Sequence, residues 1–198
     1  MKKILIALVI LVPIAITGFF GYNYFQKNIA HVHGIIIYSD NKEEMDSKLE
    51  TNKKNIEKSL TVEGKYSSKS DTLVLNTQAA NKLMNQGAFN HVTKKGEKAS
   101  FKKVKKLSAE PALWTSKTDT SVTDDSGKTI ASKSKDYIVL GEYSATSKIL
   151  ILDNEDYQNF DAKPEYVSVI KEKRDADKAL LSYKTNGSIP SHIFHYGE

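Results

Sequence analysis

The chain has 198 residues, of which 29 are lysine or arginine, 24 are aspartate or glutamate, and none is cysteine. The near balance of charge, with Arg174 as the single arginine, argues against nucleic-acid recognition, because arginine makes most bidentate contacts to bases and phosphates. The absence of cysteine excludes disulfide bonds, thiol catalysis and cysteine-ligated zinc within these residues.

An uncharged N-terminal run, residues 4–25, follows two lysines. Crossing a membrane as a helix takes about 20 mainly apolar residues. We therefore predict a transmembrane signal anchor over residues 1–25, with residues 4–25 in contact with the lipid bilayer. Because positive charge lies mainly before the run, we expect the N-terminus in the cytoplasm. One alternative is a cleaved signal peptide, for which Ala15 and Thr17 offer only a poor cleavage site, and the other is a buried helix of a soluble protein.

The rest of the chain is predicted to be a short juxtamembrane spacer, residues 26–33, and one extracytoplasmic domain, residues 34–198. The domain is long enough to bury a sizeable core. It opens with GIIIYSD at residues 34–40, a short β-branched run that is typical of a buried strand. An Asp-Asn pair then caps a helix that we predict over residues 42–60.

Two further segments have the same layout of strand, cap and short helix. TLVLNTQAANKLMNQG combines a strand over residues 72–76 with a helix that is capped by Thr77 and stops at Gly87. KILILDNEDYQNF, residues 148–160, places an Asp/Asn cap directly after a strand. Three such units favour an arrangement of helices laid on a sheet.

The remaining segments are mostly predicted strands. We expect strands over residues 61–65, 100–107, 112–117, 136–143 and 166–170, a hairpin of residues 121–123 and 129–132 around the turn DDSGK, a helix over residues 175–183, and a C-terminal edge strand. The prediction is an α+β fold: a mixed β-sheet with three to four short helices, preceded by one N-terminal transmembrane helix.

Histidines are the candidate metal ligands. His31 and His33 alternate near the start of the domain, and His192 and His195 lie near its end. Alternate residues of a strand project to the same side, so the four imidazoles would converge if the two ends of the domain meet. Exposed terminal histidines without a metal are the competing interpretation.

A basic run, KKGEKASFKKVKK, is the candidate surface for contact with anionic lipid headgroups or envelope polymers. Its lysines are Lys94, Lys95, Lys98, Lys102, Lys103, Lys105 and Lys106. The competing interpretation is a solvated loop and an edge strand that is protected from aggregation by charge. The sequence contains no G-x-S-x-G, P-loop, G-x-G-x-x-G or H-E-x-x-H motif, so no active site is predicted.

The stretches GIIIYSD, TLVLNTQAANKLM and DYIVLGEYSATSKILILDNEDY resemble segments of small, uncharacterised cell-surface proteins and lipoproteins of Gram-positive bacteria. This resemblance implies a location at the cell envelope, although the chain lacks the cysteine that such lipoproteins use for lipidation. A fainter likeness is to the extracytoplasmic domains of ABC-type permeases, which also follow a strand with a short capped helix. That likeness implies an accessory module, and neither resemblance brings a catalytic residue.

We therefore expect a membrane-anchored, extracytoplasmic binding or accessory protein of the cell envelope, without catalysis, cofactor or nucleic-acid partner. Its partner would be a membrane protein complex or an anionic envelope polymer. Two alternatives stay open: a cell-wall or peptide hydrolase with an unrecognised site, and an extracytoplasmic solute or metal binder. A cleft with converging carboxylates or histidines would favour either alternative.

Overall fold

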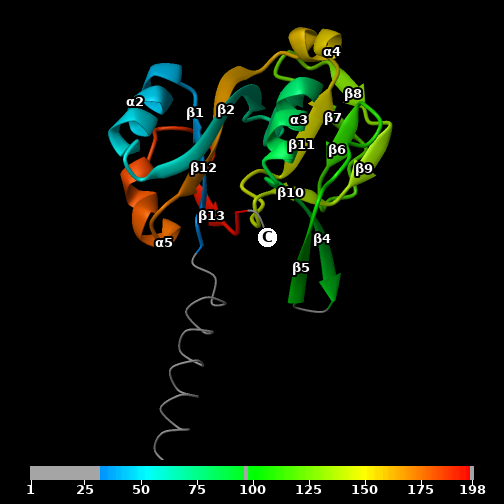
Figure 1. The fold of residues 1–198 in the computed structure, drawn as a ribbon. Helices are drawn as coiled ribbons and strands as arrows, with labels where there is room; N and C mark the ends of the chain where they lie inside the picture. Colours follow the sequence, from blue (N-terminus) through cyan, green and yellow to red (C-terminus); the bar gives the residue numbers. More distant parts are fainter. Residues whose placement is uncertain (1–31, 96–97, 197–198) are drawn as a thin grey trace, which may run out of the picture. The chain divides into compact units, whose positions relative to one another are not determined.

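The computed structural model describes residues 32–95 and 98–196, which are built around an eight-stranded mixed sheet (Figure 1). Strands β3 and β11 are parallel, as are β6 and β9, and the other neighbours are antiparallel. The strand order is β13 (His192–Phe194), β1 (Gly34–Ser39), β12 (Lys163–Glu172), β2 (Ile56–Ser67), β3 (Thr72–Asn76), β11 (Lys148–Leu152), β6 (Ala112–Trp114) and β9 (Ser134–Asp136).

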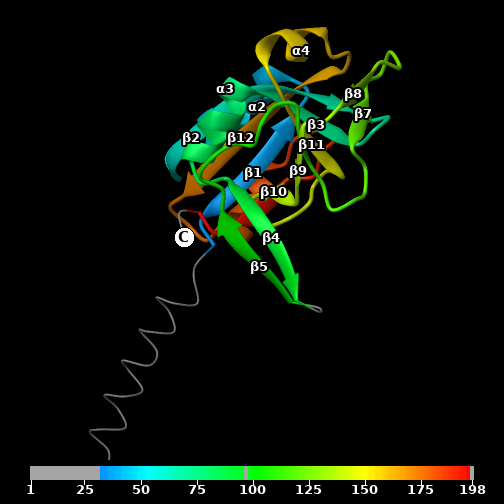
Figure 2. The ribbon, with the colours of Figure 1, turned by 90° about the vertical axis from the view of Figure 1, so that its right-hand side faces the viewer.

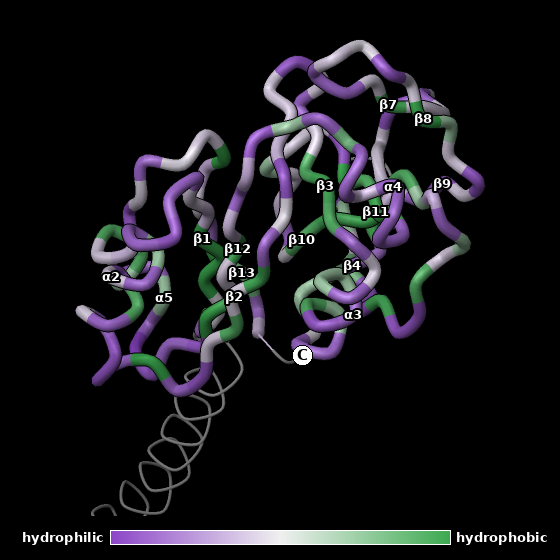
Figure 3. Tube along the Cα trace, turned by 90° about the horizontal axis from the view of Figure 1, so that it is seen from above, coloured by the Kyte–Doolittle hydropathy of each residue, from purple (hydrophilic) through white to green (hydrophobic). Residues whose placement is uncertain are grey.

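Two smaller sheets accompany the main one. The first has the order β10 (Ile138–Leu140), β4 (Phe89–Lys95) and β5 (Lys98–Lys103), and the second is the hairpin of β7 (Ser121–Thr123) and β8 (Thr129–Ala131). Figure 3 shows apolar residues concentrated on β1, β3 and β11, whereas much of α2 is hydrophilic. Burial of the central strands therefore supplies most of the apolar core.

One face of the main sheet is covered by two groups of elements. Near β1, the helices α2 (Lys42–Asn52), α5 (Ala176–Ala179) and η1 (Leu180–Tyr183) enclose a cluster that includes Ile35, Ile37 and Met45. Near β11, the β7–β8 hairpin and helix α4 (Asn154–Asn159) enclose a second cluster that includes Val74 and Leu150.

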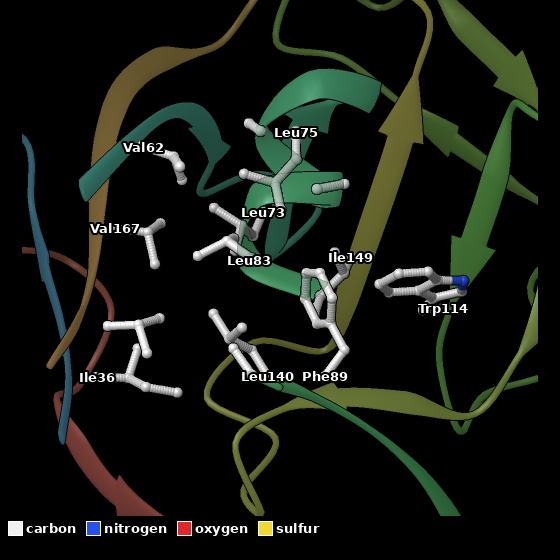
Figure 4. Close-up of a cluster of buried hydrophobic side chains, with 14 of the residues drawn as sticks. Ile36, Val62, Leu73, Leu75, Leu83, Phe89, Trp114, Leu140, Ile149 and Val167 are labelled. Carbon is white, nitrogen blue, oxygen red and sulfur yellow. The ribbon is translucent and has the colours of Figure 1, made fainter. Parts of the chain in front are cut away.

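The opposite face packs against α3 (Thr77–Asn85) and the three-stranded sheet. Figure 4 shows this cluster, in which Ile36, Leu73 and Ile149 from the main sheet meet Leu83 of α3 and Phe89 of β4. Neighbouring residues such as Ile35 and Ile36 belong to different clusters because successive side chains of a strand point to opposite faces.

The mixed α+β architecture with four helices in the described ranges confirms the predicted class of fold. The N-terminal caps are also as expected in kind: Asn41, Asn76, Asp153 and Asp175 each accept a hydrogen bond from a backbone N–H of the first helical turn. Asn76, and not Thr77, caps α3. The helix stops where Gly87 takes a positive φ of 66°.

Several predicted boundaries are wrong. The helix predicted over residues 42–60 ends at Asn52, whose buried side-chain amide donates to the carbonyl oxygens of Lys48 and Ser182. Strand β2 then begins at Ile56 and continues to Ser67. The strand predicted over residues 136–143 is divided between β9 and β10, which belong to different sheets. Strand β4 was not predicted at all.

No helix within residues 32–95 and 98–196 is long and apolar enough to cross a membrane. The transmembrane anchor predicted over residues 1–25 lies outside the described residues. So does nearly all of the predicted spacer, residues 26–33.

Candidate functional site

Strands β4 and β5 form a lysine-rich hairpin, which we call the basic hairpin. Figures 1 and 2 show it projecting from the rest of the domain. The cross-strand pairs include Val92 with Phe101 and Lys94 with Ala99, so these four residues lie on one face of the ribbon. Phe101 is 41% exposed, which is unusual for a large apolar side chain. The hairpin therefore presents an apolar residue among cations.

The predicted lysines do not all have the same role. Lys94, Lys98 and Lys102 of the hairpin are exposed, as are Lys105 and Lys106 in the segment that follows. The Lys94 ammonium lies 5.6 Å from the centre of the Tyr137 ring. These side chains are available to an anionic partner.

Lys103 is a structural residue. Its ammonium donates to the carbonyl oxygens of Gly87, at 2.8 Å, and His195, at 3.2 Å. It also lies 5.6 Å from the centre of the Phe194 ring. Lys103 thus ties the base of the basic hairpin to the C-terminal strand. Lys95 is the last residue of β4.

The two ends of the domain meet, because β1 pairs with β13 and Gly34 lies opposite Phe194, but the candidate histidines contact different partners. His31 lies outside the described residues. The Nδ1 atom of His33 lies 3.1 Å from the carbonyl oxygens of Glu172 and Arg174. His192 is buried. The Nδ1 atom of His195 lies 2.8 Å from a carboxylate oxygen of Glu142. Within the described ranges, no group of three or more His, Asp or Glu side chains is arranged to hold a metal ion.

A second candidate site is a cleft of about 210 Å³ at one end of the main sheet. Its floor and walls come from β1, β3, β6, β10 and β11, and its rim is the segment of residues 141–147 that joins β10 to β11. The lining combines aromatic rings, hydroxyl groups, one carboxylate and one ammonium group. The aromatic residues are Tyr38, Trp114, Tyr137 and Tyr143, and the charged residues are Asp71 and Lys117.

A polar frame holds the rim of the cleft in place. One oxygen of Asp71 accepts hydrogen bonds from the Ser147 backbone N–H, at 2.9 Å, and the Ser147 hydroxyl, at 2.6 Å. The other oxygen accepts from the Tyr66 hydroxyl, and the Lys117 ammonium donates to Ser147 Oγ at 3.1 Å. Burial alone would raise the pKa of Asp71, but the hydrogen bonds from Ser147 and Tyr66 outweigh it and lower that pKa.

Three rings in contact lie beside the cleft, and two of them, Tyr38 and Tyr143, line it. His192 lies between Tyr38, at 5.9 Å between ring centres, and Tyr143, at 5.7 Å. The two imidazole nitrogens lie 3.0 Å from the Leu140 carbonyl oxygen and 3.3 Å from that of Pro190. Burial lowers the pKa of His192, although these backbone contacts oppose the shift. We therefore treat the imidazole as neutral at pH 7.

Strand β12 carries a buried carboxyl group, that of Glu165, whose charge acts on Tyr38. Glu165 is 1% exposed, and its Oε1 atom has no hydrogen-bond partner among the described residues. Burial, together with the charge of Asp40, raises its pKa to about 7. The nearest strand neighbour in β2 is Gly64, which has no side chain to donate a hydrogen bond.

No motif in the sequence indicates the cleft. Asp71, Lys117 and Ser147 come from three connecting segments, and the fold alone brings them together. The sequence offers one local signal for Asp71, which is that it ends a serine-rich turn. In the structure Asp71 adopts a positive φ of 48°, a conformation that asparagine and aspartate tolerate best after glycine.

Comparisons with known proteins agree with this architecture. A family model described as an uncharacterised lipoprotein family matches residues 32–197. The chain is also similar to a 1.5 Å crystal structure of a Bacillus anthracis protein provisionally described as a lipoprotein, with a TM-score of 0.65 and 17% sequence identity. The match covers 83% of this chain and 99% of that one, and it concerns the fold. No curated protein sequence matches the chain. The resemblance to uncharacterised Gram-positive lipoproteins is thus confirmed.

Proposed function

This chain belongs to the uncharacterised lipoprotein family, and from that premise we propose that it is a membrane-anchored binding or accessory protein of the bacterial cell envelope. Its domain lies outside the cytoplasm in this proposal. Cysteine lipidation has no acceptor within the 198 residues, so the anchor is the apolar run of residues 4–25.

The observation that carries the binding role is the basic hairpin. Lys94, Lys98 and Lys102 are exposed on a ribbon that projects from the domain. Phe101 is exposed on the same face as Lys94, whereas Lys98 and Lys102 lie on the other face. Each lysine near an anionic surface contributes about 1 kcal/mol of attraction at physiological ionic strength. An exposed aromatic ring adds apolar contact that a purely solvated loop would not offer. The partner is a phosphate-bearing surface of the envelope.

A non-catalytic role agrees with the chemistry of the cleft. Ser147 donates its hydroxyl hydrogen to Asp71 and accepts a hydrogen bond from Lys117, an arrangement that superficially resembles an activated nucleophile. A general base works best with a pKa near the working pH. The hydrogen bonds to Asp71 lower its pKa, so this carboxylate is a weak base and serves to hold the rim of the cleft.

The test compares two triple variants of the full chain in phosphatidylcholine nanodiscs. The first replaces Lys94, Lys98 and Lys102 by glutamine, and the matched control replaces the exposed Lys135, Lys163 and Lys184. Binding is measured to glycerol-phosphate polymer and, separately, to vesicles that contain phosphatidylglycerol, at two salt concentrations.

The hairpin variant should lose about 3 kcal/mol, or roughly 100-fold in affinity, toward at least one of these probes. The control should stay within about threefold of the wild type, and added salt should weaken binding. An equal loss in both variants would show general charge attraction and would contradict the role of the basic hairpin. The arm that responds identifies lipid or polymer as the source of the phosphate groups.

A further inference from the structure

The cleft is a built site that the basic hairpin does not use. No described residue of β4 or β5 lines the cleft, although Tyr137, whose ring faces the Lys94 ammonium, does. The cleft lies under residues 141–147, and its volume is about 210 Å³. Pockets for drug-sized ligands measure about 300–1,000 Å³. A ligand for this cleft is therefore small, about the size of a single ring with its substituents.

Tyr143 provides a fixed aromatic surface at the mouth of the cleft. Its side chain is 56% exposed, yet its ring packs against His192, which is itself packed against the buried Tyr38. One ring nitrogen of the neutral His192 carries a hydrogen and donates it to a backbone carbonyl oxygen, of which that of Leu140, at 3.0 Å, is nearer than that of Pro190, at 3.3 Å. The exposed ring is thus supported from within the core, so a ligand that stacks on it would lose little conformational freedom of the protein.

The polar groups of the cleft favour an uncharged ligand rich in hydroxyl groups. The two charged side chains, Asp71 and Lys117, are opposite in sign and both contact Ser147 Oγ, so the cleft has almost no net charge. Asp71 already accepts three hydrogen bonds, which leaves it poorly suited to bind a ligand's ammonium group. The Lys117 ammonium donates one hydrogen bond to Ser147 and has two further N–H groups to offer.

We propose that the cleft binds a single saccharide ring. The apolar face of the sugar stacks on Tyr143, and its hydroxyl or acetamido oxygens accept hydrogen bonds from Lys117 and from the exposed hydroxyl groups of Ser116 and Ser144. A ligand with both an apolar ring face and many polar groups matches a lining of aromatic rings and hydroxyls. This assignment does not depend on the basic hairpin.

Trp114 makes the proposal measurable, because it is the single tryptophan of the chain and lines the cleft. Detergent-solubilised full chain is titrated with N-acetylglucosamine, with its dimer, and with glycine as a zwitterionic probe, while tryptophan fluorescence and heat of binding are followed. A sugar of about 15 non-hydrogen atoms that binds with the efficiency usual for small ligands has a Kd of about 1 mM. We expect saturable binding of the sugars in this range and none of glycine.

Variants separate the cleft from the rest of the surface. Tyr143→Ala should weaken sugar binding at least tenfold, whereas Tyr143→Phe should retain it because the stacking ring remains. Leu181→Ala, at an exposed position on η1, is the matched control and should leave affinity unchanged. The exposed position of Tyr143 favours retention of the fold, which near-ultraviolet circular dichroism of each variant verifies.

Three results would overturn the proposal. The first is the absence of both a fluorescence change and heat with either sugar up to 50-fold above the expected Kd, or about 50 mM. The second is saturable binding of glycine that Lys117→Gln abolishes, which would assign the cleft to a zwitterion. Sugar binding that Tyr143→Ala leaves intact would likewise remove the site from this cleft.

Discussion

Replacing the buried Glu165 by glutamine should stabilise the protein at alkaline pH and have little effect at acidic pH. The carboxyl group is 1% exposed and has a pKa of about 7 in the folded chain, against an ordinary value of 4.5. Its folded-state pKa is raised, so the stability linked to its proton is fully present below about pH 4.5 and is lost as the pH rises through about 7.

The magnitude follows from the difference between the two pKa values. One pKa unit corresponds to about 1.4 kcal/mol, so ionising Glu165 in place costs about 3 kcal/mol at pH 8.5. Glutamine has nearly the same shape and never ionises, so Glu165→Gln avoids this cost. At pH 4.5 the two chains should differ by less than about 1 kcal/mol, since both side chains are then neutral in the folded state.

The assay is urea denaturation of the detergent-solubilised full chain, followed by the fluorescence of the buried Trp114 at pH 4.5 and pH 8.5. Glu63→Gln is the matched control because Glu63 is exposed on the neighbouring strand β2. The free energy of unfolding of Glu165→Gln, relative to the wild type, should rise by about 3 kcal/mol between the two pH values. A difference that is independent of pH, or one that Glu63→Gln reproduces, would refute the reasoning.

Two further substitutions test contacts that tie the C-terminal strand to the domain. Lys103→Met removes the hydrogen bonds to Gly87 and His195 and should lower the free energy of unfolding by about 1–3 kcal/mol in the same urea assay. The control is Lys102→Met, at an exposed neighbouring position, which should change that free energy by less than about 0.5 kcal/mol. Gly34→Ala introduces a methyl group that overlaps the ring and the carbonyl oxygen of Phe194, so it should lower the free energy of unfolding by about 1–3 kcal/mol and lower the melting temperature. An unchanged melting temperature would show that β13 can move away freely.

Local signals in the sequence predicted the strand–cap–helix units well. The runs that became β1, β3 and β11 are short and strongly apolar, and the side chain that caps the next helix is the last residue of the strand in β3 and follows within two residues in β1 and β11. Both signals depend only on neighbours along the chain, because a cap bonds to the backbone of the turn directly after it. Tertiary contacts were not needed to recognise them.

The end of α2 could not be predicted in the same way. Ile56 and Leu60 are four residues apart, a spacing that fits one face of a helix and also one face of a strand. The choice between the two is made by pairing with β12, in which Leu60 lies opposite Val169. Such a contact between residues more than a hundred positions apart leaves no local pattern.

The cleft shows the same limit more strongly. Tyr143 lies in a segment that reads as the end of a strand, and Asp71 and Ser147 read as ordinary turn residues. Their hydrogen bonds and the contact of the Tyr143 ring with His192 depend on where the separate segments meet. The lysine run, in contrast, could be recognised from composition, although the sequence did not distinguish the structural Lys103 from its exposed neighbours.

Crosslinking in intact cells tests the central claim most directly. A photoreactive phenylalanine analogue is placed at the exposed Phe101 of the basic hairpin, and at Leu181 as a control, in the otherwise unchanged full chain. The account predicts a phosphate-containing envelope adduct, lipid or polymer, from position 101 and little or none from position 181. Adducts from position 101 with cytoplasmic proteins alone would contradict both the extracytoplasmic location and the role of the basic hairpin.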